Sequence, residues 1–236
     1  MGGMSVTPNP RDAILDAALD IAPFEGWTDT TLRLAVEATD LPEGAGALYF
    51  PDGALGLLRH WNARTVAHVE AEIAKRGLAN LRIRDRVTEG IVIALEAIGP
   101  HEPAFRRALS RLALPDALGD AARMNWAVAD AIWHGIGDTS TDFNFYTKRA
   151  ILSGVLSASA VAWLNDTSPD KAQARAFIDR RIDNVMQFEK VKARVRGIRE
   201  TVPNPAEFLG GLRFATSDMG SGLRRPNTKR RRRRSR

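Results

Sequence analysis

Apolar residues recur along most of the chain at the three- and four-residue spacing of amphipathic helices. In the first such stretch, Asn9 can cap a helix with Pro10 at its first position, and Ile14, Leu15 and Leu19 form one stripe. Similar stripes predict a short helix that starts at Thr28 or Asp29 and carries residues 32–36. Others, ended by Gly or Pro, predict helices at residues 42–50, 54–76, 81–98, 103–114, 116–136, 141–164 and 169–195. No stretch shows the alternation of a half-buried strand. The pattern therefore predicts an all-helical fold.

The most apolar of these segments covers residues 150–164, whose only polar side chains are serines. It is shorter than the ~20 residues that a membrane-crossing helix needs, so we expect a core helix. Ser153, Gly154, Ser157 and Ala158 along it are small. Small residues on a buried helix either let another helix come close or leave room for a bound molecule, and the pattern fits both.

Composition limits the classes of protein to which the chain can belong. With 236 residues, 44% of them hydrophobic, it can bury a sizeable core. It has no cysteine, which excludes disulfides, thiolate metal sites and a cysteine nucleophile. The first ten residues lack a basic start followed by an apolar run, so they predict neither a secretory signal nor a transit peptide.

The net charge of +6 comes from one end of the chain. Residues 224–236 contain nine basic residues and no acid, so the remainder carries a net charge of about −3. An acidic remainder argues against a broad nucleic-acid-binding surface on the folded part. The basic tail itself has three interpretations: contact with an anionic membrane, nonspecific binding of nucleic acid, or a solvated segment without a partner.

Residues 14–58 resemble the helix-turn-helix end of TetR-type regulators, with Leu48-Tyr49-Phe50 as the aromatic closing motif. A helix that reads DNA needs hydrogen-bond donors for bases and phosphates. Residues 42–50 supply Glu43 and no Arg, Lys, Asn or Gln. We therefore do not expect specific DNA binding, and a TetR-type ligand-responsive transcriptional regulator is the alternative function.

A second resemblance is narrower. The sequences WHGIGDTSTDFNFYTKRAILSGV at residues 133–155, NDTSPD at 165–170 and FIDRRIDNVM at 177–186 resemble the ubiquinone (coenzyme Q) biosynthesis lipid-binding family, the ninth coenzyme Q protein of mitochondria. The resemblance covers about residues 11–195, and it implies a TetR-like helical bundle. It also implies a non-enzymatic protein that binds an isoprenoid lipid and presents a prenylated quinone precursor to a ring hydroxylase. We also expect a homodimer, as TetR-like folds usually form. The cysteine-free composition and the lack of a signal or transit pattern predict a cytoplasmic protein, which a lipid-handling role would bring to the surface of the inner membrane.

The resemblance assigns candidate site residues. A lipid tunnel would be lined by Leu109, Leu112, Ile132, Ile151, Leu152, Val155 and Leu156. A surface for the hydroxylase would contain Leu114, Pro115, Trp133, His134, Asp138 and Tyr146. The alternative for part of this surface is an ordinary core stripe, because Trp126 and Trp133 are seven residues apart on one helix face. Membrane contact falls on Phe208, Leu209, Leu212 and Arg213, in a short amphipathic stretch at residues 206–215.

The residues themselves offer little for catalysis. His134 lies four residues from both Asp130 and Asp138, which is too few ligands for a metal site, and no HExxH, CxxC or GxSxG motif occurs. Thr139 and Asp142 have capping-box spacing before the apolar helix. We expect no catalytic residue, metal or cofactor, and only a bound isoprenoid or quinone-precursor lipid.

The expected domain organisation follows from these assignments. Residues 1–9 form a disordered N-terminus, 10–53 a helix-turn-helix-like part, 54–196 the lipid-binding helical domain, and 197–236 a flexible C-terminal segment with the Arg-rich tail. An unrecognised enzyme is the third functional alternative.

Overall fold

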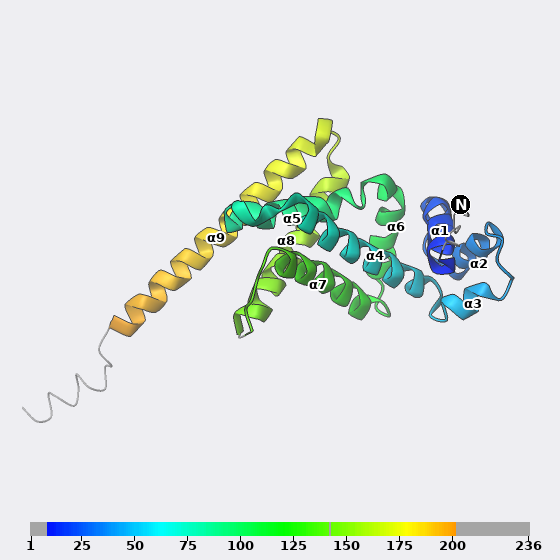
Figure 1. The fold of residues 1–236 in the computed structure, drawn as a ribbon, viewed down its shortest axis with the longest axis horizontal. Helices are drawn as coiled ribbons and strands as arrows, with labels where there is room; N and C mark the ends of the chain where they lie inside the picture. Colours follow the sequence, from blue (N-terminus) through cyan, green and yellow to red (C-terminus); the bar gives the residue numbers. More distant parts are fainter. Residues whose placement is uncertain (1–8, 142, 202–236) are drawn as a thin grey trace, which may run out of the picture. The chain divides into compact units, whose positions relative to one another are not determined.

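The computed structural model describes the backbone of residues 9–201 except residue 142, and side chains as far as residue 187. Packing divides the chain into a unit of residues 1–187 and a second of residues 188–236. All regular structure in the described ranges is helical (Figure 1), which confirms the predicted fold class.

Three short helices come first: α1 (Pro10–Glu25), α2 (Asp29–Glu37) and α3 (Ala45–Tyr49). The predicted cap at Asn9 forms, since its side chain accepts a hydrogen bond from the Arg11 amide at 3.0 Å. At the start of α2, the Thr28 hydroxyl accepts one from the Thr31 amide at 3.2 Å, which decides between the two predicted starts. The third helix is shorter than predicted. Its preceding residues form a turn, in which the Ala45 amide donates to the Pro42 carbonyl at 2.8 Å.

Longer helices make up the rest of the described chain. They are α4 (Gly53–Arg76), α5 (Ile83–Glu96), α6 (Glu102–Leu112), α7 (Leu118–Gly135), α8 (Phe143–Asn165) and α9 (Ala172–Thr201), with 3₁₀ turns η1 (Leu78–Asn80), η2 (Gly99–His101) and η3 (Pro169–Lys171). Helix α7 packs along both α4 and α8, and α5 packs against α4, α7 and α8. Figure 1 shows α4 running from the α1–α3 end to this larger group of helices.

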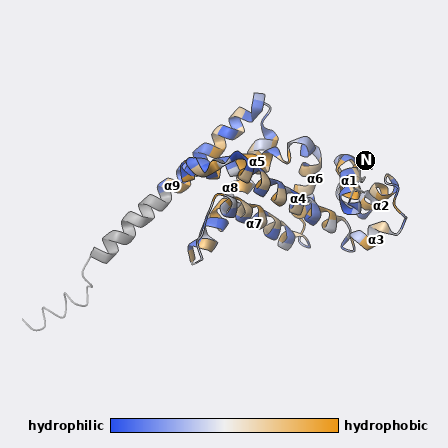
Figure 2. Cartoon of the chain, viewed as in Figure 1, coloured by the Kyte–Doolittle hydropathy of each residue, from blue (hydrophilic) through white to orange (hydrophobic). Residues whose placement is uncertain are grey.

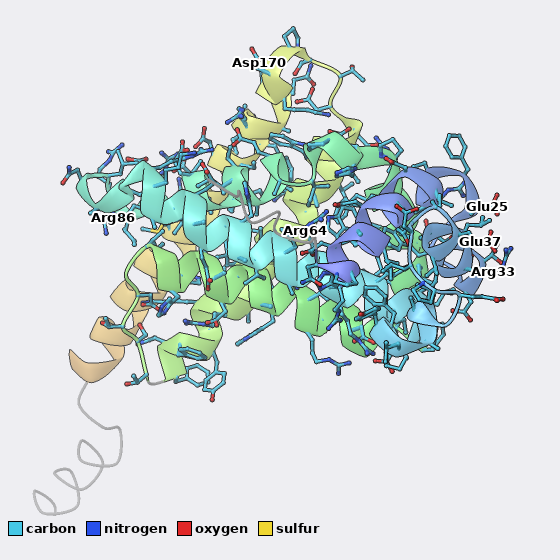
Figure 3. All side chains as sticks on the ribbon, turned by 45° about the vertical axis from the view of Figure 1, so that its right-hand side comes forward. Glu25, Arg33, Glu37, Arg64, Arg86 and Asp170 are labelled. Carbon is cyan, nitrogen blue, oxygen red and sulfur yellow. The ribbon has the colours of Figure 1, made fainter. Side chains whose placement is uncertain are left out.

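The start of α9 differs from the prediction, which placed Pro169 at its first position. The backbone enters the left-handed region at Asp170 and Lys171, with φ of 53° and 54°, and the helix begins only at Ala172. The Asp166 carboxylate accepts from the Ala174 amide at 2.7 Å, and the Ser168 hydroxyl accepts from the Gln173 amide at 3.2 Å. These bonds satisfy backbone amides in the first turn of α9, which starts three residues after the predicted start at Pro169. Figure 3 shows Asp170 at the tip of this connection.

Buried side chains gather into two hydrophobic cores, and Figure 2 shows the apolar positions that supply them along each helix. The first core joins α1–α3, the beginning of α4, and α6; Trp27 lies in it and donates its indole N–H to the Ala104 carbonyl at 2.9 Å. The second core joins the end of α4 to α5, α7, α8 and α9, around Ile91, Ile132 and Ile178.

Helix α8 is covered on one side only. Leu152, Val155 and Trp163 are buried, as expected for a core helix. A second stripe, at Ala150, Gly154, Ser157 and Val161, is exposed in the described unit. We call this stripe the open face of α8. The apolar run at residues 150–164 therefore has an uncovered side.

Candidate functional site

A cavity of about 600 Å³ lies where the two hydrophobic cores meet. Its wall contains Leu58 and Met124 from the first core, and Leu95 and Leu156 from the second. The complete lining is Leu58, Trp61, Asn62, Thr65, Ala94, Leu95, Ile98, Phe105, Ala108, Leu109, Leu112, Ala113, Leu118, Ala121, Ala122, Met124, Asn125, Val128, Leu156, Ser157, Ala160 and Val161. This volume falls in the range of small-molecule sites, and the lining is mostly apolar as such sites are.

The cavity is open to the surface through apolar side chains. Leu109, Leu118 and Val161 belong to its lining, yet they are 36%, 56% and 53% exposed. They come from α6, α7 and α8, so three helices form this rim. Exposed apolar side chains that continue into an apolar cavity are typical of a ligand entrance or a contact surface.

The structure places the seven predicted tunnel residues in two groups. Leu109, Leu112 and Leu156 line the cavity. Ile132, Leu152 and Val155 instead pack in the second core, and half-buried Ile151 is also absent from the lining. Leu152 and Leu156 are four residues apart and share a face of α8, so the division between them falls along the helix rather than around it. Sequence alone does not show how far along α8 the cavity extends.

The cavity wall also contains residues that the prediction did not name. Trp61 and Leu58 come from α4, Leu95 from α5, Ile98 from the connection after α5, and Phe105 from α6. Each belongs to an apolar stripe visible in the sequence. An apolar stripe in the sequence does not show which of its residues pack in a core and which line the cavity between the two cores.

The segment between α7 and α8 holds a buried ion-pair network around Asp138, whose side chain is 5% exposed. Asp138 accepts from Lys148 Nζ at 2.7 Å, from the Ser140 hydroxyl at 2.8 Å and from Arg149 Nη1 at 3.2 Å. Arg149, 3% exposed, also donates to Asp130. Burial raises the pKa of Asp138, but the hydrogen bonds from Lys148 and Ser140 outweigh burial and lower this pKa to about 2.

The six residues of the predicted hydroxylase surface differ in their exposure. Leu114, Pro115, His134 and Tyr146 are exposed. Trp133 is half-buried and donates its indole N–H to the Lys148 carbonyl at 3.2 Å. Asp138 is enclosed by two cations, so it supports this region rather than facing outward. The partner contact assigned to Asp138 stays a prediction.

Helix α7 ends before Asp138, which separates the three residues considered as weak metal ligands. The helix stops at Gly135, and Gly137 has φ of +89°. Exposed His134 therefore does not share a helix face with Asp138, as an unbroken helix would allow. In the described residues no group of three or more His, Asp or Glu side chains is placed to hold a metal ion.

The helix-turn-helix-like end is acidic at its outer edge. Figure 3 shows Glu25, Arg33 and Glu37 together there, and Arg33 forms an ion pair with Glu37 at 2.6 Å. Helix α3, in the place of a DNA-reading helix, exposes Ala47 and Leu48. Neither side chain donates a hydrogen bond.

Some assigned residues lie outside the described residues. They are Phe208, Leu209, Leu212 and Arg213, the basic tail, and Asp142 of the predicted capping box. None of the described helices is both long and apolar enough to cross a membrane.

Comparison with known proteins places these features in context. A model of the COQ9 family matches residues 118–189, which cover α7, α8 and the start of α9. The chain is 30% identical over 195 residues to the mitochondrial ubiquinone biosynthesis protein COQ9 of Rattus norvegicus, across 80% of this chain and 62% of that protein. It is 29% identical over 219 residues to the Drosophila melanogaster protein of the same name, across 91% of this chain and 66% of that protein. The chain thus spans less than two thirds of either relative.

Among solved structures, a TetR transcriptional regulator from Nitrosomonas europaea ATCC 19718 is similar in fold. The TM-score is 0.59 at 19% sequence identity, over 73% of this chain and 95% of that one. At this identity the likeness establishes the all-helical TetR-like fold alone. Together, the sequence matches and this fold confirm the expected resemblance: the chain is similar in sequence to the COQ9 ubiquinone biosynthesis proteins and has a TetR-like helical fold.

Proposed function

We propose that the chain is a non-enzymatic accessory protein of ubiquinone biosynthesis. In this role it holds a prenylated quinone precursor and presents the ring to a hydroxylase of the pathway. The observation that carries the proposal is the apolar cavity of about 600 Å³ with its exposed apolar rim. The names of the COQ9 relatives supply the pathway.

The physical need for such a protein follows from the hydrophobic effect. A polyprenyl tail strongly favours hydrocarbon over water, so an enzyme in water must either reach into the membrane or receive its substrate from a carrier. The cavity offers Leu95, Leu112 and Leu156 in place of lipid contacts. We assign it the tail of the precursor, and we assign the protein to the cytoplasmic surface of the inner membrane.

The lining favours binding over catalysis. Among the described residues of the cavity wall, none carries an acid, a base or a cysteine. General acid–base and nucleophilic catalysis use such groups. The hydroxylase would therefore supply the chemistry, and the exposed residues near α8, Tyr146 and His134, would supply its contact surface.

A cavity-filling substitution tests the proposal. Ala121 lines the cavity and is half-buried, so Ala121→Phe should occupy part of the space needed by the tail. Ala127→Phe is the matched control, because Ala127 lies on the same helix, is half-buried and does not line the cavity. Lipids extracted from purified full-length protein are identified by mass spectrometry.

We expect isoprenoid lipid with the wild-type and Ala127→Phe proteins and a several-fold loss with Ala121→Phe. Recovery of only phospholipid from the wild type, together with normal quinone levels in cells lacking the gene, would refute the proposal.

The TetR-type alternative predicts a different result. A regulator retards a specific DNA fragment at moderate salt. The acidic side chains of Glu25 and Glu37 and the exposed Ala47 and Leu48 of α3, which carry no hydrogen-bond donor, lead us to expect no specific retardation. A genomic fragment selected and shifted by the purified chain would favour the regulator.

A further inference from the structure

The cavity wall is not uniformly apolar. Asn62 and Thr65 on α4, Asn125 on α7 and Ser157 on α8 bring neutral polar side chains to it. A polar side chain in an apolar site orients the bound molecule, because its hydrogen-bonding capacity has to be matched. These four groups differ in whether their hydrogen bonds are already made within the protein.

Most of this capacity is used. The Thr65 hydroxyl donates to the Trp61 carbonyl at 3.0 Å, and the Ser157 hydroxyl donates to the Ser153 carbonyl at 3.0 Å. The Asn125 Nδ2 group donates both of its hydrogens, to the Ser153 carbonyl and to Ser157 Oγ, each at 2.9 Å. Because a carbonyl only accepts, the amide nitrogen of Asn125 must face Ser153. This fixes the orientation of the amide.

This orientation leaves the amide oxygen of Asn125, Oδ1, as an acceptor at the cavity wall. Within the described residues, no donor is hydrogen-bonded to Asn125 Oδ1, which accepts only. The Asn62 amide also has no hydrogen-bond partner there, and it can donate or accept. The site thus has a dedicated acceptor on α7 and a more adaptable group on α4.

An acceptor selects a ligand that carries a donor. A ring hydroxyl can donate to Asn125 Oδ1, whereas a quinone carbonyl or a methyl ether places one acceptor against another. An aromatic ring also suits this wall, since Trp61 and Phe105 both line it and their rings meet edge to face at 6.0 Å between centroids. Exposed Ser157 places this polar end of the cavity near the surface.

We propose that Asn125 marks the head-group end of the cavity and that the occupant donates an aromatic hydroxyl to Asn125 Oδ1. The site then prefers a phenol or hydroquinone over the corresponding quinone or methyl ether. This inference rests on the proposed lipid-binding function and adds to it the chemical class of the ring. It also places the ring at the cavity edge, with the tail inside.

The test compares two synthetic probes, a phenol that bears a farnesyl chain and its methyl ether. Binding to the full chain is followed by tryptophan fluorescence, because Trp61 lines the cavity. We expect the wild type to bind the phenol about fivefold more tightly, as one hydrogen bond of ordinary net strength provides. Asn125→Leu should bind both probes with nearly equal affinity.

Ala127→Leu provides the matched control. Ala127 lies on the same helix as Asn125 and does not line the cavity, so the preference for the phenol should persist. Thermal denaturation of each variant reports folding separately. Equal binding of both probes to the wild type, or an unchanged preference in Asn125→Leu, overturns the inference. Failure of both probes to bind the folded wild type instead counts against lipid binding itself.

Discussion

Asp138 illustrates how a single charge can organise a connection without touching a ligand. Its carboxylate is almost fully buried, and it is paired with Lys148 and with buried Arg149. Arg149 in turn stacks on the Phe145 ring, with 3.5 Å from its guanidinium carbon to the ring centroid. The start of α8, including its aromatic side chains, is therefore positioned through one carboxylate.

Loss of that charge should destabilise the fold. Asp138→Asn leaves Lys148 and Arg149 without their shared carboxylate, and the pKa of Asp138, lowered from 3.8 to about 2, corresponds to about 2 kcal/mol in the free energy of unfolding at neutral pH. Because the pKa is lower in the folded state, this contribution is complete above pH 4–5 and disappears as the pH falls toward 2. Urea denaturation across this pH range measures it.

Asp130→Asn is the control for this prediction. Asp130 pairs with the same Arg149, but its side chain is 46% exposed, so the free energy of unfolding should change by less than about 1 kcal/mol. Equal destabilisation by the two substitutions, or a wild type that loses no more stability in acid than Asp138→Asn, would contradict the role given to Asp138.

At the scale of elements, the sequence predicted best where local chemistry sets the boundary. The caps at Asn9 and Thr28 and the stop at Gly77 follow from side-chain hydrogen bonds or from φ of +60° at Gly77. The start of α9 was displaced because Asp166 competes for the helix amides. The sequence around Pro169 does not reveal this, because either Ser168 or Asp166 can accept the hydrogen bonds of the first helix amides.

The close approach of α5 to α7 depends on Gly90. A methyl group there would lie 2.5 Å from Ile132 Cγ2, a buried atom of the second core. Gly90→Ala should lower the free energy of unfolding by about 1–3 kcal/mol, despite the better helix propensity of Ala. Chemical denaturation of the purified protein provides the value.

A double-mutant cycle isolates the steric cause. Ile132→Ala removes the obstructing methyl group and is itself destabilising by about 2–5 kcal/mol. In that background Gly90→Ala should instead stabilise by up to about 1 kcal/mol, because only helix propensity remains. The same loss in both backgrounds would show that Ile132 is not the obstacle.

At the scale of the whole molecule, the cavity was the least predictable feature. The sequence identified the apolar content of α8 but not which side stays open, because that depends on how two cores meet. Of the residues assigned to the lipid tunnel, Leu156 lies in the cavity wall, whereas Leu152, one turn away, packs in the core. Such an assignment needs the spatial positions of α4, α5 and α6, which no local pattern contains.

The open face of α8 also bears on assembly. We propose that a second copy of the chain covers its first part, at Ala150 and Gly154, which would provide the expected homodimer and leave the cavity rim at Val161 open. Gly154 lies on this face, and an added Cβ there meets no atom within 4 Å. Gly154→Leu should therefore leave the monomer folded, with a modest gain in helix propensity, while preventing close approach of a partner helix.

Sedimentation of the wild type and Gly154→Leu at the same micromolar concentrations compares their masses, and circular dichroism confirms that both are folded. We expect a dimer for the wild type and a monomer for the variant, because a glycine that admits a neighbouring backbone cannot be replaced by a bulky side chain without separating the helices. A monomeric wild type would remove the proposed homodimer. A variant that dimerises as tightly as the wild type would move the contact to another face and leave the open face of α8 for the hydroxylase.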